Sequence, residues 1–242
     1  MVIMVHGACG YMGREVLRLL AGSYPDTTVV PVDVGSDCPD VYRTPQEFSG
    51  KADCIIDFSH HSATKHLLAY ATATKTPLVL ATTGQTEEEL AAIEAASGQI
   101  PLFFSSNMSL GVAELIRMAK EAARAFPDAD IEIVEAHHNR KLDVPSGTAL
   151  TIAKQLQTVR PGAQLNIGRH EDGRRKKEEI GIHSLRMGNV VGTHEVILST
   201  PTQTLTLRHE AHDRKLFAEG AVAAAMFLMG KPAGMYGMND IL

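Results

Sequence analysis

The residues best suited to chemistry lie together in the segment EAHHNRKLDVPSGTAL, residues 135–150. His137 and His138 are adjacent, Lys141 follows three residues later, and a Pro-Ser-Gly-Thr run leads into a helical pattern. Imidazole and ammonium groups can carry a proton to a reacting atom, and free N–H groups at a helix N-terminus bind anions. The spacing therefore predicts a site that holds an anion and supplies a proton.

Two elements must position these groups. Residues 130–136, DIEIVEA, alternate as a β-strand does, so the histidine pair stands at a strand end. In an extended chain adjacent side chains point to opposite faces, so the two rings would have different surroundings. A helix is predicted to begin near Ser146, which leaves the N–H groups of Gly147 and Thr148 and two hydroxyl groups for an anion.

Other interpretations of these residues stay open at this point. A histidine pair can lie in a surface loop or between lobes, and Ser146 can be a plain helix N-cap. A zinc site would combine the pair with His60, His61 and Glu135, but the sequence has no H-x-x-x-H spacing and no cysteine partner for it. Spacing alone does not separate a proton-and-anion site from a structural role, and we expect no metal.

A glycine-rich loop near the start of the chain predicts a dinucleotide site. Gly7, Gly10 and Gly13 in GACGYMG follow an apolar strand pattern and precede a helical one. Such a loop lets a pyrophosphate approach backbone N–H groups at the helix N-terminus. Asp33 lies twenty residues after Gly13 at the end of a second strand pattern, where its carboxylate could accept hydrogen bonds from a ribose.

The surroundings of Asp33 bear on the choice of cofactor. The stretch VDVGSD offers no Arg or Lys beside the carboxylate to hold a 2′-phosphate, so NADH is favoured over NADPH. Because ligands of open α/β sheets bind at the carboxyl ends of the strands, the segments FSHH, ATTG and SSNM are candidates to contact the ribose and nicotinamide.

The bulk composition is that of a soluble globular protein. The 242 residues are 44% hydrophobic and 21% charged, with a net charge of -5 and no tryptophan. These values give no sign of nucleic-acid or membrane binding. The three cysteines, Cys9, Cys38 and Cys54, form no C-x-x-C motif, and no signal peptide is evident, so we expect a cytoplasmic location.

The hydrophobic pattern predicts two kinds of fold along the chain. Up to about residue 108, short apolar strands alternate with helices, which is typical of a doubly wound parallel sheet of the Rossmann type. Strand patterns are 2–7, 27–33, 52–59, 77–84 and 100–106, and helical patterns are 11–23, 62–75 and 86–98. Residues 109–212 predict an α+β region with a mainly antiparallel sheet, whose hairpins turn at Gly188-Asn189 and Pro201-Thr202. A helical pattern then covers 214–230.

The segment EAHHNRKLDVPSGTA resembles the signature of the 4-hydroxy-tetrahydrodipicolinate reductase (dihydrodipicolinate reductase) family, E-x-H-H, two residues, K, then D-x-P-S-G-T-A. Further segments resemble the family in order along the chain. These are GACGYMG, ATTG in place of the usual GTTG, SSNMSLGV, and the late SLRMGNVVGTHEV. The replacement of Gly by Ala81, and the lack of a basic residue after Asp33, are departures that bear on cofactor choice.

The resemblance implies an NAD(P)H-dependent reductase of a cyclic imine-type dicarboxylate in the diaminopimelate route to lysine. It implies a dinucleotide-binding domain of residues 1–108 and 213–242, and a substrate-binding domain of residues 109–212 that builds a homotetramer. Runner-up functions are reduction of another imine or aldehyde-bearing acid, and a non-catalytic cofactor sensor. A sensor would not need His137, His138 and Lys141 together.

The resemblance also assigns roles to residues. His137 and Lys141 would transfer protons. The residues implied to bind the substrate are His138, Ser146, Gly147, Thr148 and Arg186. The residues expected to line the cofactor are Gly7, Ala8, Cys9, Gly10, Tyr11, Met12, Asp33, Phe58, Ala81, Thr82, Thr83, Ser105, Ser106, Asn107 and Met108. The basic run GRRKKEE (173–179) is expected to be a solvated loop.

Overall fold

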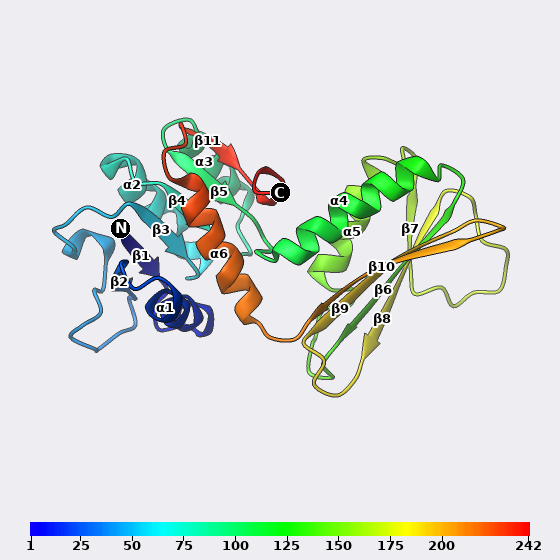
Figure 1. Cartoon of the computed structure of the whole chain (residues 1–242), viewed down its shortest axis with the longest axis horizontal. Helices are drawn as coiled ribbons and strands as arrows, with labels where there is room; N and C mark the ends of the chain where they lie inside the picture. Colours follow the sequence, from blue (N-terminus) through cyan, green and yellow to red (C-terminus); the bar gives the residue numbers. More distant parts are fainter. The chain divides into compact units, whose positions relative to one another are not determined.

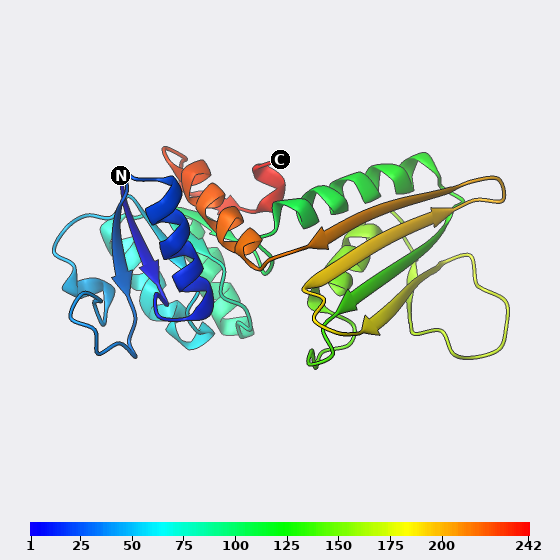
Figure 2. The ribbon, with the colours of Figure 1, turned by 60° about the horizontal axis from the view of Figure 1, so that its bottom comes forward.

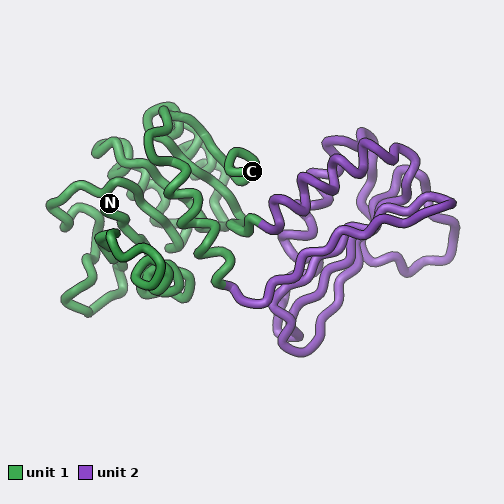
Figure 3. Tube along the Cα trace, viewed as in Figure 1, with its two compact units in different colours: residues 1–110, 215–242 green, residues 111–214 purple.

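The chain divides into two units in the computed structural model, which describes residues 1–242 (Figure 3). The first unit combines residues 1–110 with residues 215–242, and the second contains residues 111–214. The end of the chain therefore belongs to the same unit as its beginning.

The first unit is built on a six-stranded parallel sheet in the order β11-β5-β4-β3-β1-β2 (Figure 1). The strands are β1 (Val2–His6), β2 (Thr28–Val32), β3 (Cys54–Asp57), β4 (Leu78–Leu80), β5 (Pro101–Phe104) and β11 (Gly234–Tyr236). The helices are α1 (Tyr11–Ser23), α2 (Thr64–Thr74), α3 (Glu87–Ser97) and α6 (Lys215–Leu228), with short 3-10 turns η1 (Pro45–Glu47), η2 (His61–Ala63) and η3 (Met238–Asp240). The doubly wound sheet predicted from the alternating pattern is confirmed.

Both faces of this sheet are covered, which explains its continuous apolar strands. Ile3 and Val5 pack with α1 and α6, whereas Met4 between them packs with α2 and α3 on the opposite face. In α6, a Cβ at Gly220 would lie 1.7 Å from the carbonyl oxygen of Met108, so a side chain is excluded there. This close approach packs α6 against the loop that follows β5.

The second unit is a five-stranded sheet with helices on one face only. The strands are β6 (Asp130–His137), β7 (Gln164–Ile167), β8 (Glu179–Arg186), β9 (Gly192–Ser199) and β10 (Thr204–Ala211), in the order β10-β9-β6-β8-β7. Helices α4 (Leu110–Ala125) and α5 (Gly147–Gln157) pack on the face that carries Ile131, Ile133 and Ile182. Figure 2 shows both helices on this side, with no helix over the other face of the sheet.

The pairing in the second sheet differs from the expected antiparallel hairpins. The hairpin at Pro201-Thr202 is present, because β9 and β10 pair antiparallel. The turn at Gly188-Asn189 does not form a hairpin, because β6 lies between β8 and β9, parallel to the first and antiparallel to the second. With β7 also parallel to β8, the sheet is mixed. No helix in the chain is both long enough and apolar enough to cross a membrane.

Candidate functional site

The glycine loop makes the tight turn that the sequence predicted. Gly7 has φ +80°, and a Cβ there would lie 2.7 Å from the backbone carbonyl group of Phe58. A Cβ at Gly13 would lie 2.1 Å from the carbonyl oxygen of Gly7, so neither position accepts a side chain. Gly10 precedes the first residue of α1 and provides no side-chain cap. No side chain of Gly10 caps the N–H groups of this helix start, which can therefore donate to a phosphate group.

Asp33 lies directly after β2 and is tied to the same loop. Its carboxylate accepts hydrogen bonds from the amides of Cys9, at 2.9 Å, and Gly35, at 3.0 Å. Gly7, Gly10, Asp33 and Phe58 line a cavity of about 540 Å³. The same cavity is lined by His60 of the FSHH segment and by residues that the sequence did not single out, among them Arg43, His6 and His66.

A second cavity of about 510 Å³ shares Phe58, Ser59 and His60 with the first. Predicted cofactor residues make up most of its wall, namely Tyr11, Met12, Phe58, Ala81, Thr82, Thr83, Ser106, Asn107 and Met108, and Phe217 of α6 joins them. Ala8, Cys9 and Ser105 line neither cavity. Cys9 acts through its amide on Asp33, while the Ser105 hydroxyl donates to the carbonyl oxygen of Asn107.

A buried carboxylate holds the strand ends beneath these cavities in place. Asp57, at the end of β3, is 1% exposed and lies 2.7 Å from Nδ1 of His6, at the end of β1. The Thr82 hydroxyl donates to Asp57 at 2.6 Å, and the amide of Ser59 donates to it at 3.2 Å. Three strand-end loops are thereby fixed by one side chain, which positions the walls of a cofactor site.

In the second unit, Glu135 is the centre of the histidine segment. It lies on the helix-covered face of β6 and is fully buried. Nδ1 of His137 lies 2.6 Å from its carboxylate, and the amide of Ser146 donates to it at 3.1 Å. Burial alone would raise the pKa of Glu135, but the hydrogen bonds from His137 and Arg186 outweigh it and hold the pKa far below the usual range.

Arg186 forms a bidentate pair with Glu135, with both nitrogen–oxygen distances at 2.8 Å. Its Nη groups also donate to the carbonyl oxygens of Leu185 and Asp143, and its Nε is buried. The guanidinium N–H groups are therefore directed at the protein. This geometry departs from the substrate contact predicted for Arg186 and favours a supporting role behind Glu135.

Ser146 caps α5 and is 1% exposed. Its hydroxyl accepts from the amide of Ala149 at 3.2 Å and lies 3.1 Å from Nε2 of His194, so the N-cap alternative describes this hydroxyl better than substrate contact does. His194 is opposite Glu135 in the β6–β9 pairing, and its ring meets that of His137 edge to face, with centroids 5.2 Å apart. Burial lowers the pKa of His194 to about 4, and it is therefore neutral near pH 7.

The loop after β6 brings Lys141 to the start of α5. Its Nζ lies 2.9 Å from the carboxylate of Asp143. The hydrogen bond from Lys141 is the main cause of a lowered pKa for Asp143, and the amide of Gly147 contributes as well. Gly147 is exposed, and a Cβ there would meet no atom within 4 Å. The carboxylate of Asp143 thus lies between the ammonium group and the helix N-terminus.

His138 lies just beyond β6, as expected for the second histidine of the pair. Its Nε2 is 3.4 Å from a guanidinium nitrogen of Arg214. Desolvation is the main cause of a lowered pKa for His138, and the positive charges of Arg140 and Arg214 add to it. Its neutral ring can therefore act as a hydrogen-bond partner for a polar ligand.

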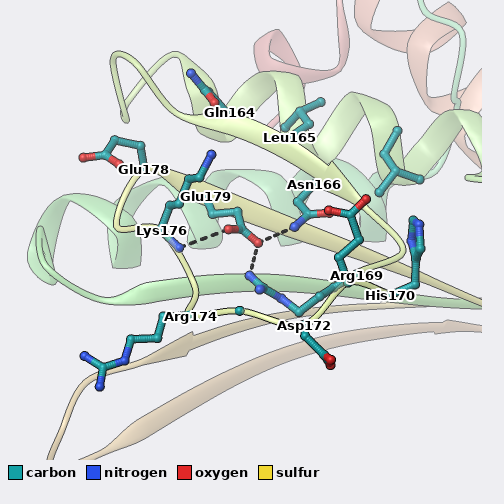
Figure 4. A pocket seen from close by; sticks show the side chains of 13 residues that line it. Gln164, Leu165, Asn166, Arg169, His170, Asp172, Arg174, Lys176, Glu178 and Glu179 are labelled. Carbon is teal, nitrogen blue, oxygen red and sulfur yellow. Dashed lines mark hydrogen bonds and ion pairs between the residues drawn. The ribbon is translucent and has the colours of Figure 1, made fainter.

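The basic loop before β8 forms a separate hollow in the second unit. This hollow of about 630 Å³ is polar, and Figure 4 shows Glu179 within it, contacted by Asn166, Arg169 and Lys176. None of the predicted site residues lines it. Most of the loop is exposed, as expected, at residues 173–174 and 176–178. Arg175 is the exception, because it is anchored to Asp130, Glu132 and three backbone carbonyl groups.

Sequence reasoning gave no correct role to three residues that the structure brings to these sites. Arg43 lies ten residues beyond Asp33, yet β2 continues into a bridge between Val32 and Tyr42 that returns it to the same cavity. Glu135 and His194 lie in the two segments that resemble the family, EAHHNRKLDVPSGTA and SLRMGNVVGTHEV, but only the β6–β9 strand pairing places them opposite each other. No group of three or more His, Cys, Asp and Glu side chains has the arrangement of metal ligands.

Family models and known proteins match this chain along nearly its whole length. The family model described as dihydrodipicolinate reductase, N-terminus, matches residues 1–108, and the C-terminus model matches residues 111–242. The 4-hydroxy-tetrahydrodipicolinate reductase of Caldanaerobacter subterraneus is 44% identical over 99% of this chain and 97% of its own length. That of Clostridium tetani is 40% identical over 99% and 96% of the two chains.

A solved structure shares the fold along the whole chain. Dipicolinate-bound dihydrodipicolinate reductase from Paenisporosarcina sp. TG-14 has a TM-score of 0.83 with 24% sequence identity, covering 100% of this chain and 99% of that one. With both family models matched and relatives at 40% and 44% identity over nearly the full length, this chain belongs to the dihydrodipicolinate reductase family.

Proposed function

We propose that this protein reduces 4-hydroxy-tetrahydrodipicolinate to tetrahydrodipicolinate with NADH or NADPH, in the diaminopimelate route of lysine biosynthesis. The family is one of pyridine-nucleotide-dependent reductases, and full-length relatives carry this name. The observation that carries the proposal is the cluster at the end of β6. There a buried carboxylate holds the ring of His137 in the same segment that brings Lys141 to a helix N-terminus.

The two units have different proposed roles. The cavities beside the glycine loop and Asp33 make the first unit the dinucleotide-binding domain. The bound cofactor would supply the hydride. The glycine loop fits a pyrophosphate because a Cβ at Gly13 would fill the turn, and Asp33 is placed to accept from a ribose. The second unit is proposed to bind the substrate.

His137 and Lys141 are the proposed proton carriers. Reduction of a conjugated imine-type ring leaves electron density that a proton must neutralise, so an acid is needed at the site. Nε2 of His137 is the ring nitrogen not used by Glu135, and Lys141 carries three donors on a flexible stem. Both are polar groups in a largely enclosed position, since the side chains are 11% and 23% exposed.

The carboxylate of Asp143 stands in for a carboxylate of the substrate. It is held by Lys141 and by the amide of Gly147, and these groups bind any carboxylate in the same way. We infer that a substrate carboxylate takes this place, with the amides of Gly147 and Thr148 as further donors and His138 as a neutral partner. Ser146 and Arg186 then do not contact the substrate but hold Glu135 in place.

NADH is the proposed preferred donor, since the carboxylate of Asp33 would repel a 2′-phosphate. Arg43 lines the same cavity and reaches Asp37 and the carbonyl oxygen of Ser36 from there. Its side chain is 60% exposed and can turn toward a ligand. We propose that Arg43 supplies the positive charge that allows NADPH to be used as well.

The uncovered face of the second sheet is the proposed tetramer interface. Its strands present apolar side chains away from α4 and α5, among them Val134, Leu185 and Ile197, and Leu185 is 49% exposed. Burial of such a face against further copies of the chain would remove this apolar area from water. Light scattering should give four times the 26.1 kDa chain mass, and a monomer would contradict the interface.

In the decisive assay, the substrate is formed in the reaction mixture itself. Purified protein is mixed with aspartate semialdehyde, pyruvate and the synthase that condenses them, with NADH and NADPH in parallel reactions. The proposal predicts oxidation of the cofactor only when all components are present. No consumption of either cofactor would refute it, whereas turnover with a different imine or aldehyde-bearing acid alone would point to another reductase.

A further inference from the structure

We propose that Glu135 is a positioning residue that ties the proton carrier to the carboxylate-binding helix. This inference rests on the proposed function, in which His137 handles a proton. Glu135 contacts neither substrate nor cofactor in that scheme. It acts through His137, Ser146 and Arg186, each of which bonds to its carboxylate.

The strand pattern forces this carboxylate into the interior. Ile131, Ile133, Glu135 and His137 alternate onto the helix-covered face of β6, so Glu135 takes a position where an apolar residue is expected. A buried charge is costly unless it is fully paired. Here the fully buried carboxylate meets a guanidinium fork, an imidazole and a backbone amide. Such complete pairing at an otherwise apolar position indicates a role beyond packing.

The pairing decides which nitrogen of His137 carries hydrogen. An ionised carboxylate only accepts hydrogen bonds, so Nδ1 of His137 must be the donor in the 2.6 Å contact. Nε2 is then the nitrogen that exchanges a proton with a ligand. A Cβ at Gly192 would lie 3.1 Å from Nε2, so glycine at this position keeps the space beside that atom open. The ring is thus set in one tautomer and one orientation.

The same carboxylate fixes the start of α5. It accepts from the amide of Ser146, which immediately precedes the Gly147 and Thr148 donors proposed for the substrate. On the other side, His194 holds the Ser146 hydroxyl. One side chain therefore fixes the positions of His137 and of the Gly147 and Thr148 amides relative to each other. A bound substrate can be aligned with an acid only if both are fixed in this way.

The variant Glu135→Gln tests this role, with Glu114→Gln as its matched control. Glu114 lies on α4, away from the proposed interface, and its carboxylate also pairs with two nitrogens of an arginine, Arg117. Glutamine has the same shape as glutamate, but its side-chain amide can both donate and accept a hydrogen bond. It therefore no longer holds the ring of His137 in one tautomer. In the coupled assay we expect kcat to fall by at least about tenfold for Glu135→Gln. The control should stay within about twofold, and both should keep the wild-type Kd for NADH.

Equal kcat in Glu135→Gln and wild type would overturn the proposal, as would an equal loss in Glu114→Gln. A second measurement covers the case in which Glu135→Gln does not fold. Long-range ¹⁵N–¹H spectra of the wild-type protein, assigned with His137→Gln, report the tautomer of the neutral ring at about pH 9. Hydrogen on Nδ1 is expected, and hydrogen on Nε2 would refute the positioning role. This reading does not depend on turnover, so it separates the failure of this inference from a failure of the proposed function.

Discussion

Acid destabilisation of the second unit should depend on His194. Its ring is 4% exposed, and burial lowers its pKa from 6.5 to about 4. In the unfolded chain the same ring returns to the ordinary value. Between pH 6.5 and pH 4 the unfolded state therefore binds a proton that the folded state does not, so the free energy of unfolding falls as the pH falls.

The size of this effect follows from the two pKa values. At pH 5 the difference between 6.5 and about 4 corresponds to a loss of about 2 kcal/mol relative to neutral pH. The loss reaches about 3 kcal/mol once the pH is below both values. In the variant His194→Gln nothing titrates at this position, so the variant should lack this share of the acid destabilisation.

Urea unfolding of wild type and His194→Gln at pH 7 and pH 5 gives, for each protein, the change in the free energy of unfolding between the two pH values. The effect of His194 is the difference between these two changes. Far-UV circular dichroism follows both units, and tyrosine fluorescence reports the first unit alone, because all five tyrosines lie there. We expect wild type to lose about 2 kcal/mol more than His194→Gln between the two pH values, in the second unit only. An equal loss in both proteins would refute the assignment of a buried, neutral His194.

Three further predictions concern the cofactor and proton sites. In Gly13→Ala the added Cβ would meet the carbonyl oxygen of Gly7 at 2.1 Å, so calorimetry should show the loss of NADH binding, and wild-type affinity would show that the loop tolerates a side chain. Lys141→Ala should lose at least about 99% of kcat while it binds NADH normally, and the opposite pattern would assign Lys141 to the cofactor. Arg43→Ala should raise the KM for NADPH at least about fivefold and leave that for NADH unchanged, and an equal change in both would remove Arg43 from 2′-phosphate binding.

Much of the fold was predictable because it depends on local patterns. The apolar runs and glycine positions located every strand of the first sheet except β11, whose three residues are too few to show a period. The pairing of β8 with β6 was not predictable in this way. Side-chain alternation identifies a strand and its faces, but Gly188-Asn189 looks the same whether the next strand pairs with β8 or crosses over β6.

The candidate site divides along the same line. His137, Lys141 and the α5 start are neighbours in sequence, so their spacing predicted a shared site. Arg186, which pairs with Glu135, is 51 positions away on β8, and His194 lies opposite Glu135 on β9, so only the folded sheet brings these residues together. Arg186 and Ser146 were predicted to touch the substrate because they sit in family segments, whereas their hydrogen bonds turn them toward Glu135 and the α5 cap.

The most direct test of the central claim follows one hydrogen atom. The coupled reaction is run with NADH deuterated at the transferable position of C4, and the product is examined by mass spectrometry. We expect one molecule of tetrahydrodipicolinate carrying one deuterium for each NADH oxidised. NADH oxidation without labelled tetrahydrodipicolinate, or no oxidation in the complete mixture, would contradict the assignment of this chain as the reductase.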